Sequence, residues 1–467
     1  MTRQTWVKVA ALLLIGVSAI SGCSSKVSRA LQPQERELDT GGPITMHYHS
    51  ALYYPTEISL KAEGYIVGVE KSPRNVVSSP GDMKVHGVED AYLSQKSAAS
   101  KLDESRVLYV SHVLENFPGE RSVNNCALYN AYYRPGDKGY SPLTRFCNSQ
   151  VPKAVPPEKA FVSSWSALDS LQNSMHEKLL KGGYTHIVVV VMGWNTVQEE
   201  AVRNFNSILL NMKKAGKDDF RPLFIGVTWP SQWNSPWVDP LYKLFSFPVK
   251  SADADELGMT WLGVLLHDTV YKANQNLGVH PALPVVVIGH SFGSRAVSIA
   301  ACVGPVISRA DAPIARHAVD TVINYQGAFK TTRLMHDDSD KGIALGQHCS
   351  YVKNFFMTAS VHDEAVNQAF WGDYVGSGDS YRKYCDDSKT NMSCATADSQ
   401  GNVKFNSRKS SAITYINADA LIKLNSFFSG GGAHSDIYRA EHGALSWKLV
   451  SDPTLRSPQI VQSSASP

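Results

Sequence analysis

The stretch of sequence that decides the fold is Pro284-Val285-Val286-Val287-Ile288-Gly289-His290-Ser291-Phe292-Gly293. Four consecutive β-branched residues follow the proline, and such a run is typical of a strand that is covered on both faces. Residues 295–301 predict a helix with small side chains on the side that faces the sheet. The sequence therefore predicts a buried strand, a sharp turn and a helix in direct succession.

The turn between the strand and the helix has the pattern G-x-S-x-G. A serine at the apex of such a turn is held in a strained backbone conformation, and side chains at Gly289 or Gly293 would crowd it. The turn presents the Ser291 hydroxyl above the sheet, and it places the backbone N–H of Phe292 at the start of a helix, where it can stabilise a developing oxyanion. Ser291 is thus the candidate nucleophile and Phe292 a candidate oxyanion donor.

This unit resembles the α/β-hydrolase superfamily, the lipases and esterases in particular, over about residues 163–450. The resemblance implies an α/β fold with a mostly parallel central sheet and helices on both faces, preceded here by an N-terminal extension. It also implies a catalytic serine, acid and histidine in that chain order. The expected chemistry needs no cofactor. A metal site is not expected, since the chain has no C-x-x-C pattern or compact Cys/His cluster.

The chain around this unit alternates between helices and strands. Apolar periodicity predicts helices at residues 165–181, 198–214 and 252–276. Apolar runs predict further buried strands at residues 186–192, 222–228, 318–325 and 351–357.

The strand at 186–192 ends in Gly193-Trp194. In the superfamily the corresponding strand usually ends in His-Gly, and the residue after the glycine lends its backbone N–H to the oxyanion hole. Met192 stands in place of that histidine. Because the glycine is kept, the resemblance implies Trp194 as the second oxyanion donor, with Gly193 as the alternative.

The acid is expected just past the strand at 351–357, which is where the superfamily places it. Asp363 in the following loop is therefore the candidate acid, and its neighbour Glu364 could replace it. Three aspartates after the preceding strand are more distant alternatives: Asp337, Asp338 and Asp340.

The histidine is expected on a loop near the C-terminus. His434 follows Gly430-Gly431-Gly432-Ala433, a flexible approach that would let the ring reach the nucleophile, and its loop resembles the corresponding loop of related hydrolases. His442, expected on or near the closing helix, is the alternative.

An aromatic segment follows the strand at 222–228. It opens with Trp229-Pro230-Ser231, which resembles a group of mostly uncharacterised bacterial α/β-hydrolases. The segment would lie near the carboxyl ends of the strands, where open α/β sheets bind ligands. Its rings either form an apolar wall or lid for the substrate or fill the core: Trp229, Trp233, Trp237, Tyr242, Phe245 and Phe247.

The N-terminal residues resemble a bacterial lipoprotein signal. Arg3 and Lys8 precede a short apolar run that begins at Val9, and Ile20-Ser21-Gly22-Cys23 resembles a lipobox. The resemblance implies a signal peptide at 1–22, lipidation of Cys23, a tether at 23–54 and attachment to the outer membrane, facing the periplasm. An ordinary secretory signal with an incidental cysteine is the alternative.

The remaining domain organisation follows composition. Residues 55–157 contain strand-like pieces at 64–69 and 107–112, which belong either to the first strands of the sheet or to a small separate module. Residues 158–455 form the expected hydrolase domain. It includes an irregular polar insertion at about 376–411, and a flexible tail follows at 456–467.

Charge and cysteine content limit the partners and the compartment. The chain has 45 basic and 42 acidic residues. Removal of residues 1–22, with two basic and no acidic residues, leaves a nearly neutral chain that gives no reason to expect a nucleic-acid partner. An even set of six cysteines after Cys23 is compatible with disulfides in an oxidising compartment. The expected pairs are Cys126–Cys147 and Cys385–Cys394, with Cys302 and Cys349 either paired or free.

Together these features predict a membrane-anchored serine hydrolase that acts on ester or lipid-like substrates, a carboxylesterase or lipase. His434 would remove the proton of Ser291, Asp363 would orient the histidine, and water would hydrolyse the acyl-enzyme. Two alternatives stay open. The chain could be a catalytically inactive interaction protein of the envelope, which Met192 favours, or a peptidase, thioesterase or acyltransferase with the same site.

Overall fold

The structure of the chain is a computed structural model. It describes residues 60–71, 83–85, 108–118, 125–131, 145–147, 160–193, 196, 198–231, 251–309, 314–335, 345, 349–367, 373–386, 390–424 and 432–456. Cys23 and the expected signal peptide and tether lie outside these residues, as do Trp194 and the aromatic side chains from Trp233 to Phe247.

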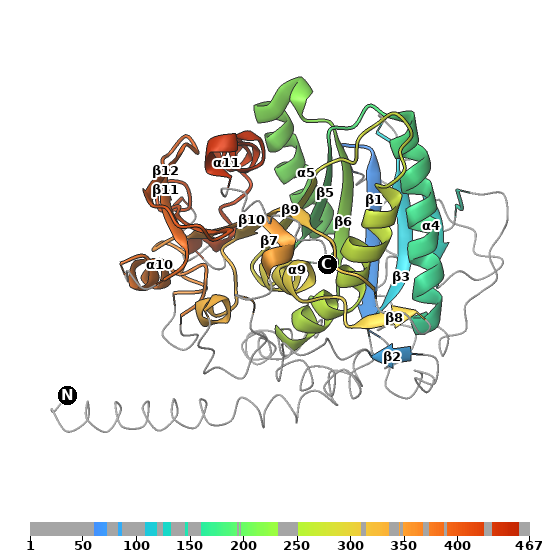
Figure 1. Ribbon diagram of the computed structural model, residues 1–467, viewed down its shortest axis with the longest axis horizontal. Helices are drawn as coiled ribbons and strands as arrows, with labels where there is room; N and C mark the ends of the chain where they lie inside the picture. The colour runs from blue at the N-terminus through green and yellow to red at the C-terminus, as the bar shows by residue number, and fades with distance from the viewer. Residues whose placement is uncertain are drawn as a thin grey trace, which may run out of the picture.

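A mixed sheet of 11 strands organises the molecule, in the order β12-β11-β13-β10-β9-β7-β5-β6-β1-β3-β4 (Figure 1). All neighbours from β11 to β1 are parallel, while β12 at one edge and β3 and β4 at the other are antiparallel to their neighbours. The predicted mostly parallel α/β sheet is therefore confirmed. Its five central strands are β10 (Val352–Ala359), β9 (Val319–Tyr325), β7 (Val285–His290), β5 (His186–Val191) and β6 (Pro222–Thr228).

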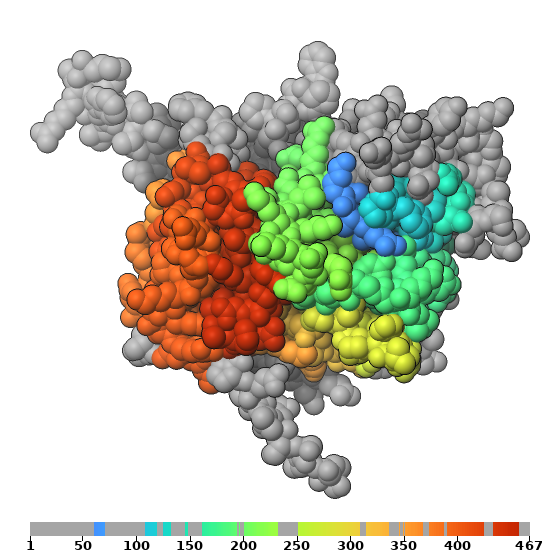
Figure 2. Space-filling view, turned by 90° about the horizontal axis from the view of Figure 1, so that it is seen from above, coloured from blue at the N-terminus to red at the C-terminus, as the bar shows by residue number. Residues whose placement is uncertain are grey.

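Helices cover both faces of this sheet (Figure 1). On one face α4 (Ala160–Lys181) and α9 (Phe292–Cys302) pack in a common core with the helical residues 251–259. On the other face α5 (Gln198–Gly216) packs against α11 (Ala440–Ser451). Figure 2 shows the consequence on the surface, where residues of the red C-terminal part border the green part of the chain.

The central strands contain long apolar runs because each of their two faces is covered by one of these cores. In β7, Val285 and Val287 point into the core beneath α4 and α9, while Val286 and Ile288 point into the core beneath α5 and α11. Successive strand residues face opposite sides, so a strand with helices on both sides needs apolar residues at every position.

Most predicted elements are present, but the long helix expected at 252–276 is wrong. The helix stops at Thr260, where φ is −113° and ψ is −108°, and the chain continues through α7 (Trp261–Val264), the π-helix η6 (Leu265–Val270) and α8 (Tyr271–Ala273). The Met259 carbonyl accepts a hydrogen bond from Val306 N–H instead of from a later helical residue. This contact outside the helix interrupts the hydrogen-bond ladder that periodicity alone predicts to be continuous.

The strand-like pieces before residue 157 belong to the main sheet. β1 (Gly64–Lys71) pairs in parallel with β6 and antiparallel with β3 (Leu108–Asn116), and β4 (Cys126–Asn130) follows at the edge. The structure thereby chooses between the two possibilities that the sequence left open. A separate two-stranded sheet joins β2 (Met83–Val85) to β8 (Ile307–Arg309).

The polar segment 376–411 is regular in its described part, so the expectation of an irregular excursion is wrong. It contains α10 (Gly378–Cys385), β11 (Ser393–Ala397) and β12 (Val403–Ser407), and β11 pairs with β13 (Ile413–Asn417). Side chains of β12 alternate between half-buried and exposed, because this strand forms the edge of the sheet. A polar, alternating edge strand does not give the apolar signal from which the central strands were predicted.

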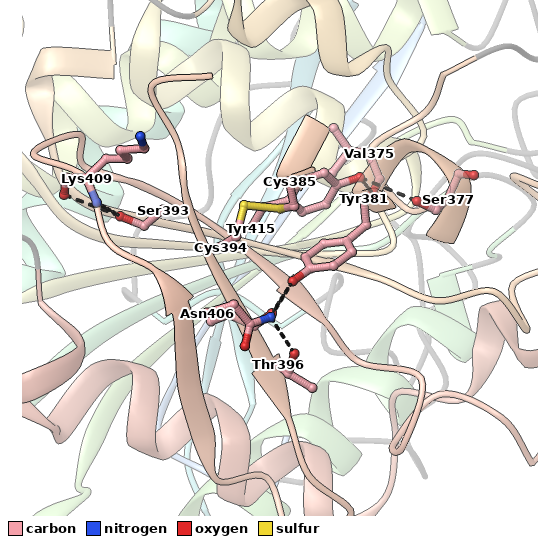
Figure 3. Close-up of a disulfide and its surroundings, with 11 residues drawn as sticks. Val375, Ser377, Tyr381, Cys385, Ser393, Cys394, Thr396, Asn406, Lys409 and Tyr415 are labelled. Atoms are coloured by element: carbon pink, nitrogen blue, oxygen red, sulfur yellow. Dashed lines mark hydrogen bonds between the residues drawn. A yellow bond between two sulfur atoms is a disulfide. The ribbon is translucent and has the colours of Figure 1, made fainter. Parts of the chain in front are cut away.

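A disulfide and a hydrogen-bond network join this segment together (Figure 3). Cys385 at the end of α10 is bonded to Cys394 in β11. The Tyr381 hydroxyl donates to the carbonyl of Ala395 at 2.9 Å and accepts from the Asn406 amide at 3.0 Å. Helix α10, strand β11 and the edge strand β12 are therefore linked.

The described residues contain three disulfides. The two predicted pairs, Cys126–Cys147 and Cys385–Cys394, are confirmed, and Cys302 is bonded to Cys349. Such a set is typical of proteins from an oxidising compartment outside the cytoplasm. Within the described ranges, no helix is long and apolar enough to cross a membrane.

Candidate active site

The turn that carries Ser291 has the strained geometry that the sequence pattern predicts. Ser291 lies between β7 and α9 with φ at 56° and ψ at −120°, a conformation that residues other than glycine rarely adopt. Its N–H donates to the carbonyl of Tyr325 at 3.0 Å, and its carbonyl accepts from Ala328 N–H at 3.1 Å. The last residue of β9 and the segment that follows it therefore hold the Ser291 backbone at both its N–H and its carbonyl.

The two glycines of the pattern allow close approach of the backbone. A side chain at Gly293 would collide with the carbonyl oxygen of Val191, and a Cβ atom at Gly289 would lie 2.5 Å from the Cα atom of Ser294. The expected crowding at both positions is thus present. It explains why the turn needs glycine before and after the serine.

Asp363 lies at the end of the sheet, in the turn that follows β10. Its side chain is completely buried, whereas Glu364 is exposed. The Asp363 carboxylate accepts hydrogen bonds from Val366 N–H at 3.3 Å and from the side chain of Gln326 at 3.1 Å. The other candidate acids, Asp337, Asp338 and Asp340, lie outside the described residues.

His434 pairs with Asp363. It lies in the short 3-10 helix η10 (Gly432–Ser435), and its Nδ1 atom is 2.8 Å from one carboxylate oxygen and 3.0 Å from the other. A carboxylate can only accept, so Nδ1 is the donor, and in a neutral ring Nε2 is the nitrogen that has a lone pair. The His434 side chain is 14% exposed, against none for Asp363. The ring can therefore meet a ligand from one side while the acid stays shielded from water.

The link that the structure shows between Ser291 and His434 runs through His290. Burial lowers the pKa of His290 to about 3, with a further contribution from the neighbouring His434 ring, so His290 is neutral. Its Nε2–H donates to the backbone carbonyl of His434 at 2.9 Å, and the two ring centroids are 4.8 Å apart. The residue before the candidate nucleophile thus holds the backbone of the candidate base.

His442, the alternative base, lies in a different environment. It is buried in α11 with its ring beside that of Tyr325, and burial lowers its pKa to about 4. Among the described residues neither of its ring nitrogens has a hydrogen-bond partner. The geometry therefore pairs His434, and not His442, with the acid.

The residues that follow β5 lie directly against Ser291, the candidate nucleophile. A Cβ atom at Gly193 would be 2.5 Å from Cβ and 3.1 Å from Oγ of Ser291. Phe292, whose N–H is the other candidate donor, opens α9 and is fully buried. Trp194, the expected second donor, lies outside the described residues, so the structure brings one of the two predicted donors to Ser291.

Trp229 and Ser231 hold the segment that follows β5, a role that the sequence did not reveal. The indole N–H of Trp229 donates to the Met192 carbonyl at 2.8 Å. The Ser231 hydroxyl donates to the carbonyl of Thr196 at 2.8 Å and accepts from its N–H at 3.2 Å. Trp229 is buried, so this first ring of the aromatic segment belongs to the core.

Replacing Trp229 by phenylalanine tests this role, because phenylalanine keeps a ring but loses the N–H donor. The Met192 carbonyl would lose its partner two residues before the expected oxyanion donor. We expect reaction at Ser291 to slow about 5-fold, as for loss of one hydrogen bond of about 1 kcal/mol. Kinetics of a serine-directed probe measure the effect. An unchanged rate in a folded variant would show that the contact does not support the site.

Comparisons with known proteins give no match. No protein-family model, no curated protein and no solved structure matches this chain.

Proposed function

We propose that this chain is a serine hydrolase of the α/β-hydrolase superfamily, with Ser291, His434 and Asp363 as its catalytic residues. The observation that carries the proposal is the hydrogen bond from His434 Nδ1 to the buried Asp363 carboxylate, together with the bond from His290, the residue before Ser291, to the His434 carbonyl. The strained turn at Ser291 and the mostly parallel sheet with helices on both faces are additional support, because the resemblance to this superfamily implies both.

The mechanism follows from the protonation of the histidine. With Nδ1–H bound to Asp363, Nε2 of His434 is the atom that takes the proton of Ser291 as its oxygen attacks an acyl carbon. The oxyanion is held by Phe292 N–H, with Trp194 N–H as the proposed second donor. The imidazolium then gives its proton to the leaving group. Water, activated by the same nitrogen, hydrolyses the acyl-enzyme.

We propose carboxylic esters as the substrate class, with lipid-like esters favoured. The support comes from the N-terminal sequence, since a lipid on Cys23 would hold the enzyme at a membrane surface. The proposed location is the periplasmic side of the outer membrane. The disulfides fit this oxidising environment.

A fluorophosphonate probe tests the function without knowledge of the natural substrate. The probe reacts only with an activated serine, and mass spectrometry then identifies the modified residue. We expect labelling at Ser291 in the mature chain and no labelling in the His434→Ala variant. A folded chain that stays unlabelled would overturn the proposal and favour the inactive envelope protein.

Replacing Asp363 by asparagine tests the acid. The amide would donate to His434 Nδ1 in place of accepting from it, which favours the wrong tautomer and leaves the imidazolium without a counter-charge. We expect the rate of probe labelling to fall about 10⁴-fold. Glu364→Gln is the matched control and should label at the normal rate, because Glu364 is exposed. A normal rate in Asp363→Asn would mean that another residue is the acid.

A further inference from the structure

Gln326 occupies an unusual position at the centre of the proposed site. It directly follows β9, its side chain is fully buried, and its backbone has a positive φ of 49°. Its N–H donates to the hydroxyl of Thr358 in β10 at 3.2 Å. A glutamine in this conformation pays a conformational cost that asparagine or glycine would reduce, so the backbone alone gives no reason for its presence.

The side chain of Gln326 makes two hydrogen bonds that explain it. Nε2 donates to Asp363 Oδ2 at 3.1 Å and to the carbonyl oxygen of Ala433 at 3.0 Å. A carboxylate and a carbonyl can only accept, so the amide nitrogen and not its oxygen must face them. One NH₂ group therefore joins the proposed acid to the residue that precedes the proposed base.

We propose that Gln326 is a positioning residue that sets the acid and the base of this site relative to each other. This inference rests on the proposed function. Asp363 follows β10, whereas His434 comes from a separate segment 71 residues later. Their hydrogen bond therefore depends on how two distant segments meet. The Gln326 side chain donates one hydrogen bond to each segment, to Asp363 and to the Ala433 carbonyl. The carbonyl of the preceding residue, Tyr325, accepts from Ser291 N–H. Two consecutive residues at the end of β9 thus position all three proposed catalytic residues.

The contact with Asp363 also has an electrostatic effect. A buried N–H donor takes up part of the negative charge on Oδ2, which reduces how strongly the carboxylate stabilises a proton on His434. Without this donor the carboxylate would attract that proton more strongly. The histidine would then stay protonated, and inactive as a base, up to a higher pH.

Two substitutions separate the amide from the backbone turn. Gln326→Met has nearly the same shape but no donor. Gln326→Asn keeps an amide and suits a positive φ, but its shorter side chain cannot span both partners. Thr358→Val is the matched control, because it removes the hydrogen bond to the Gln326 backbone and leaves the amide bridge in place.

The first readout is the pH profile of the rate of fluorophosphonate labelling at Ser291. We expect both Gln326 variants to label about 10- to 100-fold more slowly than the wild type, which corresponds to the loss of a hydrogen bond to a charged group. The acidic limb of the profile in Gln326→Met should move to higher pH. In Thr358→Val the limb should stay where it is in the wild type, whatever the change in rate.

The second readout does not need activity. NMR titration of ¹⁵N-histidine-labelled protein, with His434 assigned by its loss in His434→Ala, follows the protonation of the ring directly. We expect the His434 midpoint to rise in Gln326→Met. This measurement works even if Ser291 fails to react, so failure of the inference is distinguishable from failure of the proposed function.

The outcomes divide clearly. A higher midpoint in Gln326→Met and slow labelling in both Gln326 variants would support the proposal. A Gln326→Asn variant as active as the wild type would show that only the backbone turn matters. A Gln326→Met variant with an unshifted midpoint, or with the same profile as Thr358→Val, would reduce Gln326 to a structural residue. Any one of these three results, the fully active Gln326→Asn included, overturns the inference.

Discussion

Replacing Ser291 by alanine is expected to reduce turnover by about 10⁶-fold and to abolish fluorophosphonate labelling. The variant keeps His434, Asp363 and the oxyanion donors but has no atom that can form the acyl-enzyme. The turn itself should persist, because its hydrogen bonds to Tyr325 and Ala328 come from the Ser291 backbone. Hydrolysis of esters of graded chain length and intact-mass analysis after exposure to the probe measure the two effects.

The control for this variant is Ser207→Ala. The Ser207 hydroxyl bonds to the carbonyl of Arg203 in α5, and the pair lies at the surface. This control should label and turn over as the wild type does. Full activity in Ser291→Ala would refute the assignment of the nucleophile and with it the proposed mechanism.

Replacing His434 by alanine is expected to cost nearly as much as loss of the serine, because the three residues act as a unit. Without the imidazole, the Ser291 hydroxyl has no base to take its proton. Asp363 would also lose the N–H that donates to its two oxygens. Labelling rates and ester turnover measure the loss, and circular dichroism verifies that the variant is folded.

His442→Ala provides the discriminating comparison. His442 is buried in α11 and lies beside Tyr325 rather than beside the acid. We expect this variant to lose stability, since it leaves a cavity, but to keep the labelling rate per folded molecule. A loss of labelling in His442→Ala together with normal labelling in His434→Ala would reverse the assignment of the base.

Local pattern predicted the strained turn at Ser291 because everything that defines this turn lies within ten residues. The β-branched run makes β7, the two glycines permit the close approach of the backbone, and the helix begins at Phe292. The same holds for the central strands, whose apolar runs reflect burial on both faces. Periodicity failed at Thr260, where Val306 N–H bonds to the Met259 carbonyl, and at β12, where an edge position permits polar residues.

The acid and the base were predicted with alternatives, and the alternatives differ from the candidates in position only. Asp363 and Glu364 are chemically equivalent neighbours, but the first is buried and the second exposed. His434 and His442 are both histidines near the C-terminus, yet only His434 meets the acid. The choice depends on which way each side chain points, and that is a property of the packed chain.

The sequence by itself determined the central strands, the turn at Ser291 and two local disulfides, because each depends on residues that are near one another along the chain. Only the tertiary structure decided that β1, β3 and β4 belong to the same sheet. The hydrogen bonds from Trp229 to Met192 and from Gln326 to Asp363 and Ala433 likewise became visible only there. Gln326 carries no sequence signal, since its importance comes from two acceptors, on Asp363 and Ala433, that lie far away in the chain. Hydrogen bonds between distant segments exist only after the sheet has brought the strand ends together, and a linear pattern cannot contain them.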